Sequence, residues 1–231
     1  MLACGIVIAQ FVSLIFILSH TYISIFEVYD TEVMYLSDYY LDGEERFGPV
    51  SSFLYSIGTR LCRMRGLYAF VISDLKGAVW DELLDVGTGP GELPLVISKS
   101  FESKRIYAVD PSEPMLRIAR RRCDGTNVSI VLGSSRKVPF RRKFDIIISS
   151  LSFHHWEERE KSLKYLAGLL KRGGQIRIYE FERRELTGIM RIFVSTHAVT
   201  RKEMIDVAKS SGLKMRGIVQ RNGYIMAAMS K

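Results

Sequence analysis

The sequence predicts an α/β protein built on a doubly wound, mostly parallel sheet, and three observations lead to this. After residue 80, short apolar runs rich in β-branched residues alternate with segments of helical pattern. The first run ends in a turn with three glycines and leads directly into a helical segment. The 231 residues are 47% hydrophobic and 25% charged, an ordinary globular composition with room for one large domain. Strands separated by helices form parallel sheets that are covered on both faces.

The N-terminal segment, residues 1–33, is strongly apolar. No charged side chain stands between Met1 and Phe26, and about 20 such residues suffice to cross a bilayer as a helix. Three interpretations stay open: a membrane anchor formed by residues 1–26, a segment packed against the domain or a second copy, and a translation start assigned too early, with Met34 as the true start. The function predicted below does not depend on this choice.

Residues 34–80 are expected to form helices ahead of a larger domain at residues 81–231. Apolar residues from Phe53 to Phe70 recur at steps of three and four, which is the spacing of one helix face. Gly48 and Pro49 mark a break before them.

The domain at residues 81–231 shows a regular alternation of strands and helices. The expected strands are 83–87, 105–110, 128–133, 144–150, 175–181 and a final pair near 214–220 and 224–230. The expected helices lie around 91–101, 113–123, 157–171 and 201–211.

The turn after the first strand is the most informative part of the sequence. In LLDVGTGPGELPLVIS (83–98), glycines at alternate positions from Gly87 to Gly91 allow a tight turn and let backbone lie against a ligand. A dinucleotide fingerprint would need its third glycine at position 92, which is Glu92. Asp85 would also repel a pyrophosphate, so it suits a positively charged ligand end instead.

A second acid, Asp110, ends the second strand in YAVDPSEPML (107–116). A carboxylate at this place can accept hydrogen bonds from both ribose hydroxyls of an adenosine group. Asp85 and Asp110 therefore predict a ligand with a sugar, a positive charge and no phosphate.

With these motifs, residues 80–230 resemble the class I S-adenosylmethionine-dependent methyltransferases. Three further stretches match the family in order: VLGSSRKVPF (131–140), FDIIISSLSFHHWEE (144–158) and LAGLLKRGGQIRIYEF (166–181). The resemblance implies a Rossmann-like fold with seven strands, the last one reversed, and S-adenosylmethionine as cofactor. It implies no metal.

The resemblance also assigns the cofactor-binding positions. In the family, the first acid and the glycine loop hold the methionine part, the second acid takes the ribose, and the third motif lies beside the adenine. Ser134 stands here where the family has an Asp, so a hydroxyl or backbone group would have to bind the adenine amino group. The cofactor-binding residues implied are Asp85, Gly87, Thr88, Gly89, Gly91, Asp110, Pro111, Ser134, Ser135 and Ser149.

Two histidines after the fourth motif strand are the candidates for a catalytic base. His154 and His155 precede Trp156 in a loop that the resemblance places beside the methyl group, and His155 is the slightly preferred base. The imidazole pKa of ~6.5 suits proton transfer near neutrality, and an indole could form a wall of the substrate site. The alternative is that one histidine packs under the loop and the other bonds to backbone.

The acceptor is predicted to be a small molecule. The fourth motif lacks the Asn/Asp-Pro-Pro-Tyr/Phe signature of amino-group methylation and the Pro-Cys nucleophile of ring-carbon methylation. With a Ser-x-x-x-His-His/Trp run from Ser150 to Trp156, the fourth motif resembles that of the ubiquinone/menaquinone-biosynthesis-like and other small-molecule methyltransferases. In such enzymes the segment before the glycine motif commonly folds over the substrate. The aromatic residues of that segment are Tyr39, Tyr40, Phe47, Phe53, Tyr55 and Tyr68.

Two other functions stay open. All 33 Lys and Arg residues fall within residues 46–231, and they include clusters that could bind RNA phosphates. These clusters are Arg117/Arg120/Arg121/Arg122, Arg136/Lys137 and Arg141/Arg142/Lys143. A cofactor-binding protein without catalytic activity is the other alternative.

The cysteines indicate a reducing environment. Cys4, Cys62 and Cys123 are odd in number, far apart and outside any metal-binding spacing. We therefore expect a cytoplasmic protein, attached to a membrane if residues 1–26 form an anchor. Its oligomeric state is left open.

Overall fold

The structure is a computed structural model that describes residues 40–41, 44–45, 64–185 and 198–231. The N-terminal segment and the apolar repeat around Phe53 lie outside the described residues, as do the aromatic side chains predicted before residue 64. In the segment 34–80, a helix α3 covers Arg65–Lys76, and two short strands, β1 (Tyr40–Leu41) and β2 (Glu44–Glu45), pair antiparallel.

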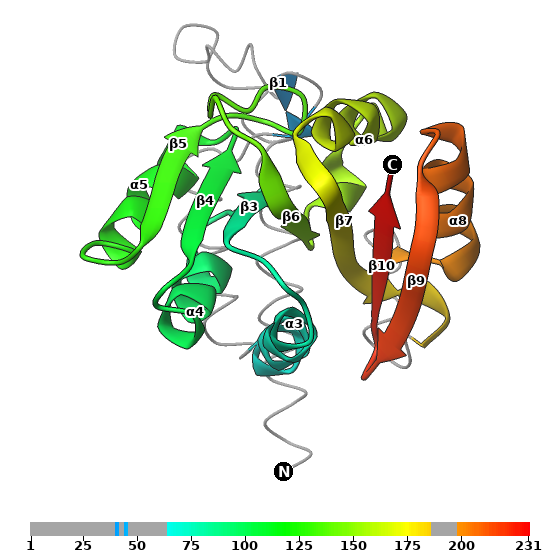
Figure 1. The fold of residues 1–231 in the computed structure, drawn as a ribbon, viewed down its shortest axis with the longest axis horizontal. Coiled ribbons are helices and arrows are strands. Elements are labelled where there is room, and N and C mark those ends of the chain that lie inside the picture. Colours follow the sequence, from blue (N-terminus) through cyan, green and yellow to red (C-terminus); the bar gives the residue numbers. More distant parts are fainter. Residues whose placement is uncertain (1–39, 42–43, 46–63, 186–197) are drawn as a thin grey trace, which may run out of the picture.

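Seven strands form a sheet in the order β5-β4-β3-β6-β7-β10-β9 (Figure 1). Their bounds are β3 Glu82–Val86, β4 Arg105–Asp110, β5 Val128–Leu132, β6 Phe144–Ser150, β7 Leu170–Glu182, β9 Lys214–Arg221 and β10 Tyr224–Ser230. Strands β3 to β7 pair in parallel, whereas β10 runs antiparallel between β7 and β9. The predicted sheet with its reversed last strand is confirmed. An eighth strand of two residues, β8 (Ala198–Val199), pairs with the end of β7 and was not expected.

Helices cover both faces of the sheet, as a doubly wound fold requires. Their bounds after α3 are α4 Glu92–Ser100, α5 Glu113–Arg122, α6 Arg159–Gly168 and α8 Arg201–Ser210. Leu83 and Leu84 are neighbours on β3 and therefore point to opposite faces, and both are fully buried. Leu83 belongs to the apolar cluster with α3 and α4, and Leu84 to the cluster with α6 and α8.

The helix predicted over 157–171 is shorter in the structure. It ends at Gly168, because Leu170 already belongs to β7 and pairs with Phe144 of β6. The apolar run before Gly173 fits a helix or a strand by pattern, and the pairing between strands decides which one forms.

The loops that follow β3, β4 and β6 all lie at the carboxyl edge of the sheet. Strand β3 pairs with β4 on one side and with β6 on the other, so the strand order reverses there. Ligands of open α/β sheets bind at this switch point. No helix in the described ranges is long and apolar enough to cross a membrane.

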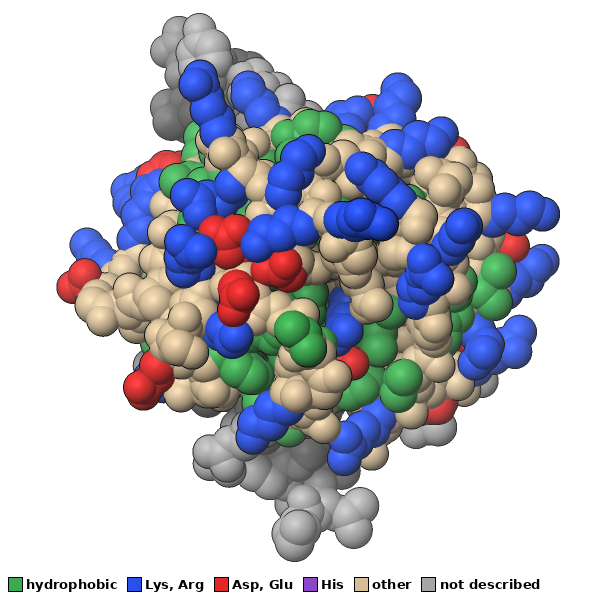
Figure 2. All heavy atoms as spheres, in the orientation of Figure 1, with side chains coloured by type: hydrophobic (Ala, Val, Ile, Leu, Met, Phe, Trp, Pro, Cys, Tyr) green, Lys and Arg blue, Asp and Glu red, His purple; other side chains and the backbone are tan. Residues whose placement is uncertain are grey.

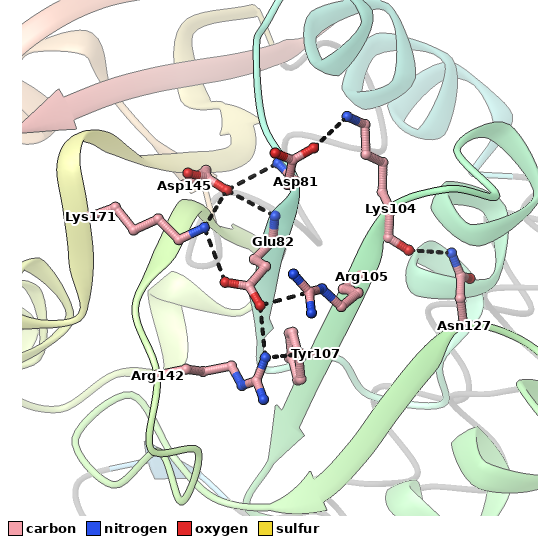
Figure 3. Close-up of polar contacts among 9 residues, drawn as sticks. All are labelled: Asp81, Glu82, Lys104, Arg105, Tyr107, Asn127, Arg142, Asp145 and Lys171. Atoms are coloured by element: carbon pink, nitrogen blue, oxygen red, sulfur yellow. Dashed lines mark hydrogen bonds and ion pairs between the residues drawn. The ribbon is translucent and has the colours of Figure 1, made fainter.

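The opposite, amino edge of the sheet is held by a network of charged side chains (Figure 3). Glu82 at the start of β3 is 7% exposed and pairs with Arg142 at 2.7 Å and Lys171 at 3.0 Å. Asp145 pairs with the same ammonium at 2.9 Å and accepts two backbone N–H groups at the start of β3. Burial raises the pKa of Glu82, but Lys171 and Arg142 outweigh it and hold that pKa below its ordinary value. The network joins β3, β6 and β7 away from the switch point.

Candidate functional site

The glycine turn between β3 and α4 brings backbone close to two neighbouring elements. Gly87 and Gly91 have φ of +75° and +76°, which disfavours any side chain. A Cβ at Gly87 would lie 2.5 Å from the Cβ of Ser152, and one at Gly91 would lie 2.8 Å from the Cβ of Ala119. Gly89 has a φ of +55°, but a Cβ there would meet nothing within 4 Å. The turn therefore packs tightly at both ends and opens onto free space in its middle.

Asp85 carries a buried carboxylate that is only half satisfied. Its side chain is 1% exposed, and Oδ2 accepts a hydrogen bond of 2.8 Å from the hydroxyl of Thr88. Oδ1 is buried and has no hydrogen-bond partner within the described part of the chain. Burial, with a smaller contribution from the charge of Asp110, raises the pKa of Asp85 to about 7. A cation beside Oδ1 would stabilise the ionised form.

Asp110 lies across the turn from Asp85 and is held by backbone. Oδ2 accepts the N–H of Gly89 at 2.7 Å, and Oδ1 accepts the N–H of Ser112 at 2.9 Å. Burial raises the pKa of this carboxyl to about 6, although both N–H groups lower it. Each carboxylate oxygen has a second lone pair, so both can still accept a hydroxyl. Pro111 is buried beside it and leads into α5.

An open cavity of about 480 Å³, open solvent included, lies between the glycine turn and α3. Of the predicted cofactor residues, Asp85, Gly87, Thr88 and Gly89 line it. Met64, Leu67 and Leu93 supply apolar walls. The half-satisfied carboxylate of Asp85, the open backbone at Gly89 and the nearby carboxylate of Asp110 fit a ligand with a positively charged end and a sugar.

The three predicted serines are bonded within the protein. Ser134 is fully buried, and its hydroxyl accepts the backbone N–H of Arg136 at 3.3 Å. Ser135 shares a hydrogen bond of 2.6 Å with Ser162 on α6. None of the three is among the residues that line the cavity. Ser134 and Ser135 therefore brace the loop after β5.

Ser149 is hydrogen-bonded to Ser152, a residue that the sequence did not mark as part of the site. The two hydroxyls lie 2.7 Å apart, and Ser152 donates to the carbonyl of Val86 at 3.0 Å. The pair thus ties the loop after β6 to the end of β3, directly under Gly87.

The histidine loop is held by a buried acid on β7. His154 Nδ1 lies 2.9 Å from Oε2 of Glu180, and its backbone N–H donates to Oε1 at 3.2 Å. The Glu180 side chain is fully buried and the His154 ring is 8% exposed. The ring of His155 lies against that of His154, with centroids 4.0 Å apart. Trp156 is 3% exposed and packs on Phe153, so it belongs to the core rather than to a substrate wall.

Sequence reasoning missed Glu180, although a signal was present. A glutamate in the apolar run IYEF, at the carboxyl end of a strand, is a buried polar residue next to the site. Tyr68 was noted only as one aromatic among several, and it lies at the cavity with its hydroxyl bonded to Glu92.

The basic clusters are partly used inside the protein. Arg122 donates to the carbonyl of Pro90 at 2.6 Å, Arg120 pairs with Glu113 at 2.6 Å, and Arg142 belongs to the amino-edge network. Figure 2 shows Lys and Arg side chains scattered over the face in view rather than gathered in one stripe.

Comparison with known proteins agrees with this geometry. Residues 84–178 match a family described as a methyltransferase domain. Over 108 residues the chain is 32% identical to the ubiquinone/menaquinone biosynthesis C-methyltransferase of Wigglesworthia glossinidia brevipalpis. That match covers 44% of this chain and 43% of the relative, so the chain spans less than half of the relative's length.

Solved structures share the fold at low sequence identity. A S-adenosylmethionine-dependent methyltransferase from Aquifex aeolicus is 21% identical with a TM-score of 0.64, covering 79% of this chain and 98% of that one. An O-methyltransferase of neocarzinostatin biosynthesis, in complex with S-adenosylmethionine and 2-hydroxy-5-methyl naphthoic acid, is 19% identical with a TM-score of 0.65, covering 79% and 58%. At these identities the likeness shows the fold.

Proposed function

Because the chain belongs to the class I S-adenosylmethionine-dependent methyltransferases, we propose that it transfers a methyl group from this cofactor to a small-molecule acceptor. The observation that carries the proposal is the half-satisfied carboxylate of Asp85 in the cavity beside the glycine turn. When bound, the cofactor supplies a methyl group on a positively charged sulfur. The protein's part is to hold the reactants in line and to exclude water.

In this proposal the parts of the cofactor are divided among the cavity residues and the loops after β4 and β5. Asp85 and the glycine turn would hold the methionine part, and Asp110 with Pro111 would hold the ribose. The adenine would lie towards Ser134 and Ser135, whose hydroxyls are bonded to the backbone of Arg136 and to Ser162. Helix α3, which lines the cavity, supports the idea that the segment 34–80 covers the site.

His154 is the better candidate for a general base. The carboxylate of Glu180 can only accept, so in the neutral ring the proton sits on Nδ1 and Nε2 is the atom that can take a proton. Glu180 also fixes the ring and would stabilise the imidazolium that forms. This reverses the slight preference for His155 that the sequence suggested.

A small acceptor is supported by what similar proteins do. The relative described above is named for quinone biosynthesis, and the neocarzinostatin enzyme holds a naphthoic acid. The identity of the acceptor here is to be found by experiment. Purified protein would be incubated with methyl-labelled cofactor and a fractionated cell extract. Label in a small molecule or lipid supports the proposal, whereas label confined to RNA refutes it.

Variants test the assigned residues. Asp110→Ala is expected to weaken cofactor binding by about 1–3 kcal/mol, measured by calorimetry, because hydrogen bonds to a charged group are lost. Asp124→Ala, an exposed acid in the turn after α5, is the control. His154→Gln is expected to lower kcat for an acceptor that must lose a proton, whereas His155→Gln should leave kcat close to that of wild type.

A further inference from the structure

A second acid, Glu92, lines the cavity with Asp85 and has no role in the site as described so far. It is the first residue of α4, and its side chain is 17% exposed. An acid in the first turn stabilises a helix through the helix dipole, and this alone could explain a glutamate there. Two further observations indicate that Glu92 also takes part in binding a ligand.

The first observation is that Glu92 is held from two other elements. The hydroxyl of Tyr68 on α3 donates to Oε2 at 3.0 Å, and the guanidinium of Arg122 on α5 lies 3.5 Å from Oε1. The same guanidinium donates to the carbonyl of Pro90 in the glycine turn. Contacts from α3 and α5 therefore hold the carboxylate at the cavity wall.

The second observation is the unpartnered Oδ1 of Asp85, which is 1% exposed and belongs to the same cavity. The other walls include Met64, Leu67 and Leu93, so the surroundings are largely apolar. Two carboxylates that share a cavity with apolar walls repel each other. Arg122 offsets part of the charge of Glu92, and a cation beside Oδ1 would also stabilise the charge of Asp85. The methionine end of the cofactor carries such positive charge on its ammonium group and its sulfonium.

We propose that Glu92 is a second carboxylate that binds the positively charged methionine end of the cofactor, and that Tyr68 positions it. The inference rests on the proposed function, since it concerns the same cofactor. The proposal adds Glu92 and Tyr68 to Asp85 and the glycines of the turn as residues of the cofactor site. It also gives α3 a part in binding, because Tyr68 connects that helix to the ligand through Glu92.

The experiment compares two ligands by calorimetry on the full chain: S-adenosylmethionine and 5′-methylthioadenosine, which has the same adenosine but neither the amino acid nor the positive charge on sulfur. Glu92→Gln keeps an oxygen for Tyr68 and removes the charge. This change is expected to weaken the affinity for S-adenosylmethionine by about 10- to 100-fold and to leave the affinity for 5′-methylthioadenosine within about 2-fold of wild type. The matched control is Glu113→Gln, which removes the first-turn acid of α5 and its pairing with Arg120, outside the cavity.

The positioning role of Tyr68 has its own readout. Tyr68→Phe is expected to weaken the affinity for S-adenosylmethionine by about 3- to 10-fold. In the double variant with Glu92→Gln, the second change should add almost nothing, because the two residues act as one unit. Tyr165→Phe, which removes a hydroxyl bonded to Val138 at a distance from the cavity, should leave the affinity unchanged.

The outcomes separate the inference from the function beneath it. If wild-type protein binds neither ligand, the proposed function itself fails. If wild type binds both and Glu92→Gln weakens both by the same factor, or weakens neither, the function stands and the assignment of Glu92 is overturned. Additive losses in the double variant overturn the role of Tyr68.

Discussion

Replacing Asp85 with Asn is expected to stabilise the ligand-free protein while it abolishes cofactor binding. The carboxyl is buried, one oxygen has no partner in the described residues, and its pKa rises from 3.8 to about 7. Folded protein therefore binds more protons than unfolded protein between these values, so stability falls as the pH rises through this window. Asn keeps an oxygen for the hydroxyl of Thr88 and cannot ionise.

The size of the effect follows from the pKa. A gap between 3.8 and about 7 corresponds to about 4 kcal/mol of unfolding free energy, and relaxation around the ionised carboxylate reduces this to about 2–4 kcal/mol. Wild type and variant should be about equally stable near pH 4. Near pH 8 the variant should be more stable by that amount.

Urea unfolding of both proteins at pH 4 to 8, without cofactor, measures the difference. Asp145→Asn serves as a control of opposite sign. Burial raises the pKa of Asp145, but Lys171 and two backbone N–H groups outweigh it and hold the pKa low. The control should therefore lose stability relative to wild type at high pH. An Asp85→Asn protein that is less stable than wild type at pH 8 would refute the reasoning.

Three other changes test the same structure. Glu82→Gln should destabilise the protein by about 2 kcal/mol at pH 7 in urea unfolding, because it removes one partner of a buried ion-pair network whose cations are partly hydrated. The loss should shrink as the pH falls below 4.5, the ordinary pKa of the group, since the pKa of Glu82 in the folded protein is lower than this. Gly91→Ala should cost at least about 2 kcal/mol in the same assay, from the positive φ and the close approach to Ala119, and a neutral result would contradict that packing. The affinity of the wild-type protein for the cofactor should rise from pH 5 to pH 8 as Asp85 and Asp110 ionise. An affinity that calorimetry finds independent of pH would count against a cationic ligand end.

The succession of strands along the chain could be predicted from the sequence because it depends on local signals, and the ligand-binding edge that such signals indicate stays a prediction. Alternating apolar runs mark strands, glycines at alternate positions mark the turn, and an acid at each of two strand ends marks the edge where ligands bind. The helix predicted to residue 171 shows the limit of this approach. Leu170 is a strand residue because β6 pairs with it, and no local pattern contains that pairing.

The amino-acid sequence alone determined which chemical groups lie at the carboxyl edge of the sheet: two acids, a glycine turn and a pair of histidines. Only the tertiary structure decided how those groups are held. Glu180 contacts the ring of His154 from 26 positions away in the chain, and Tyr68 reaches Glu92 across 24 positions. The physical reason is that a buried carboxylate acts through its partners, and burial and partners arise only when distant segments pack together.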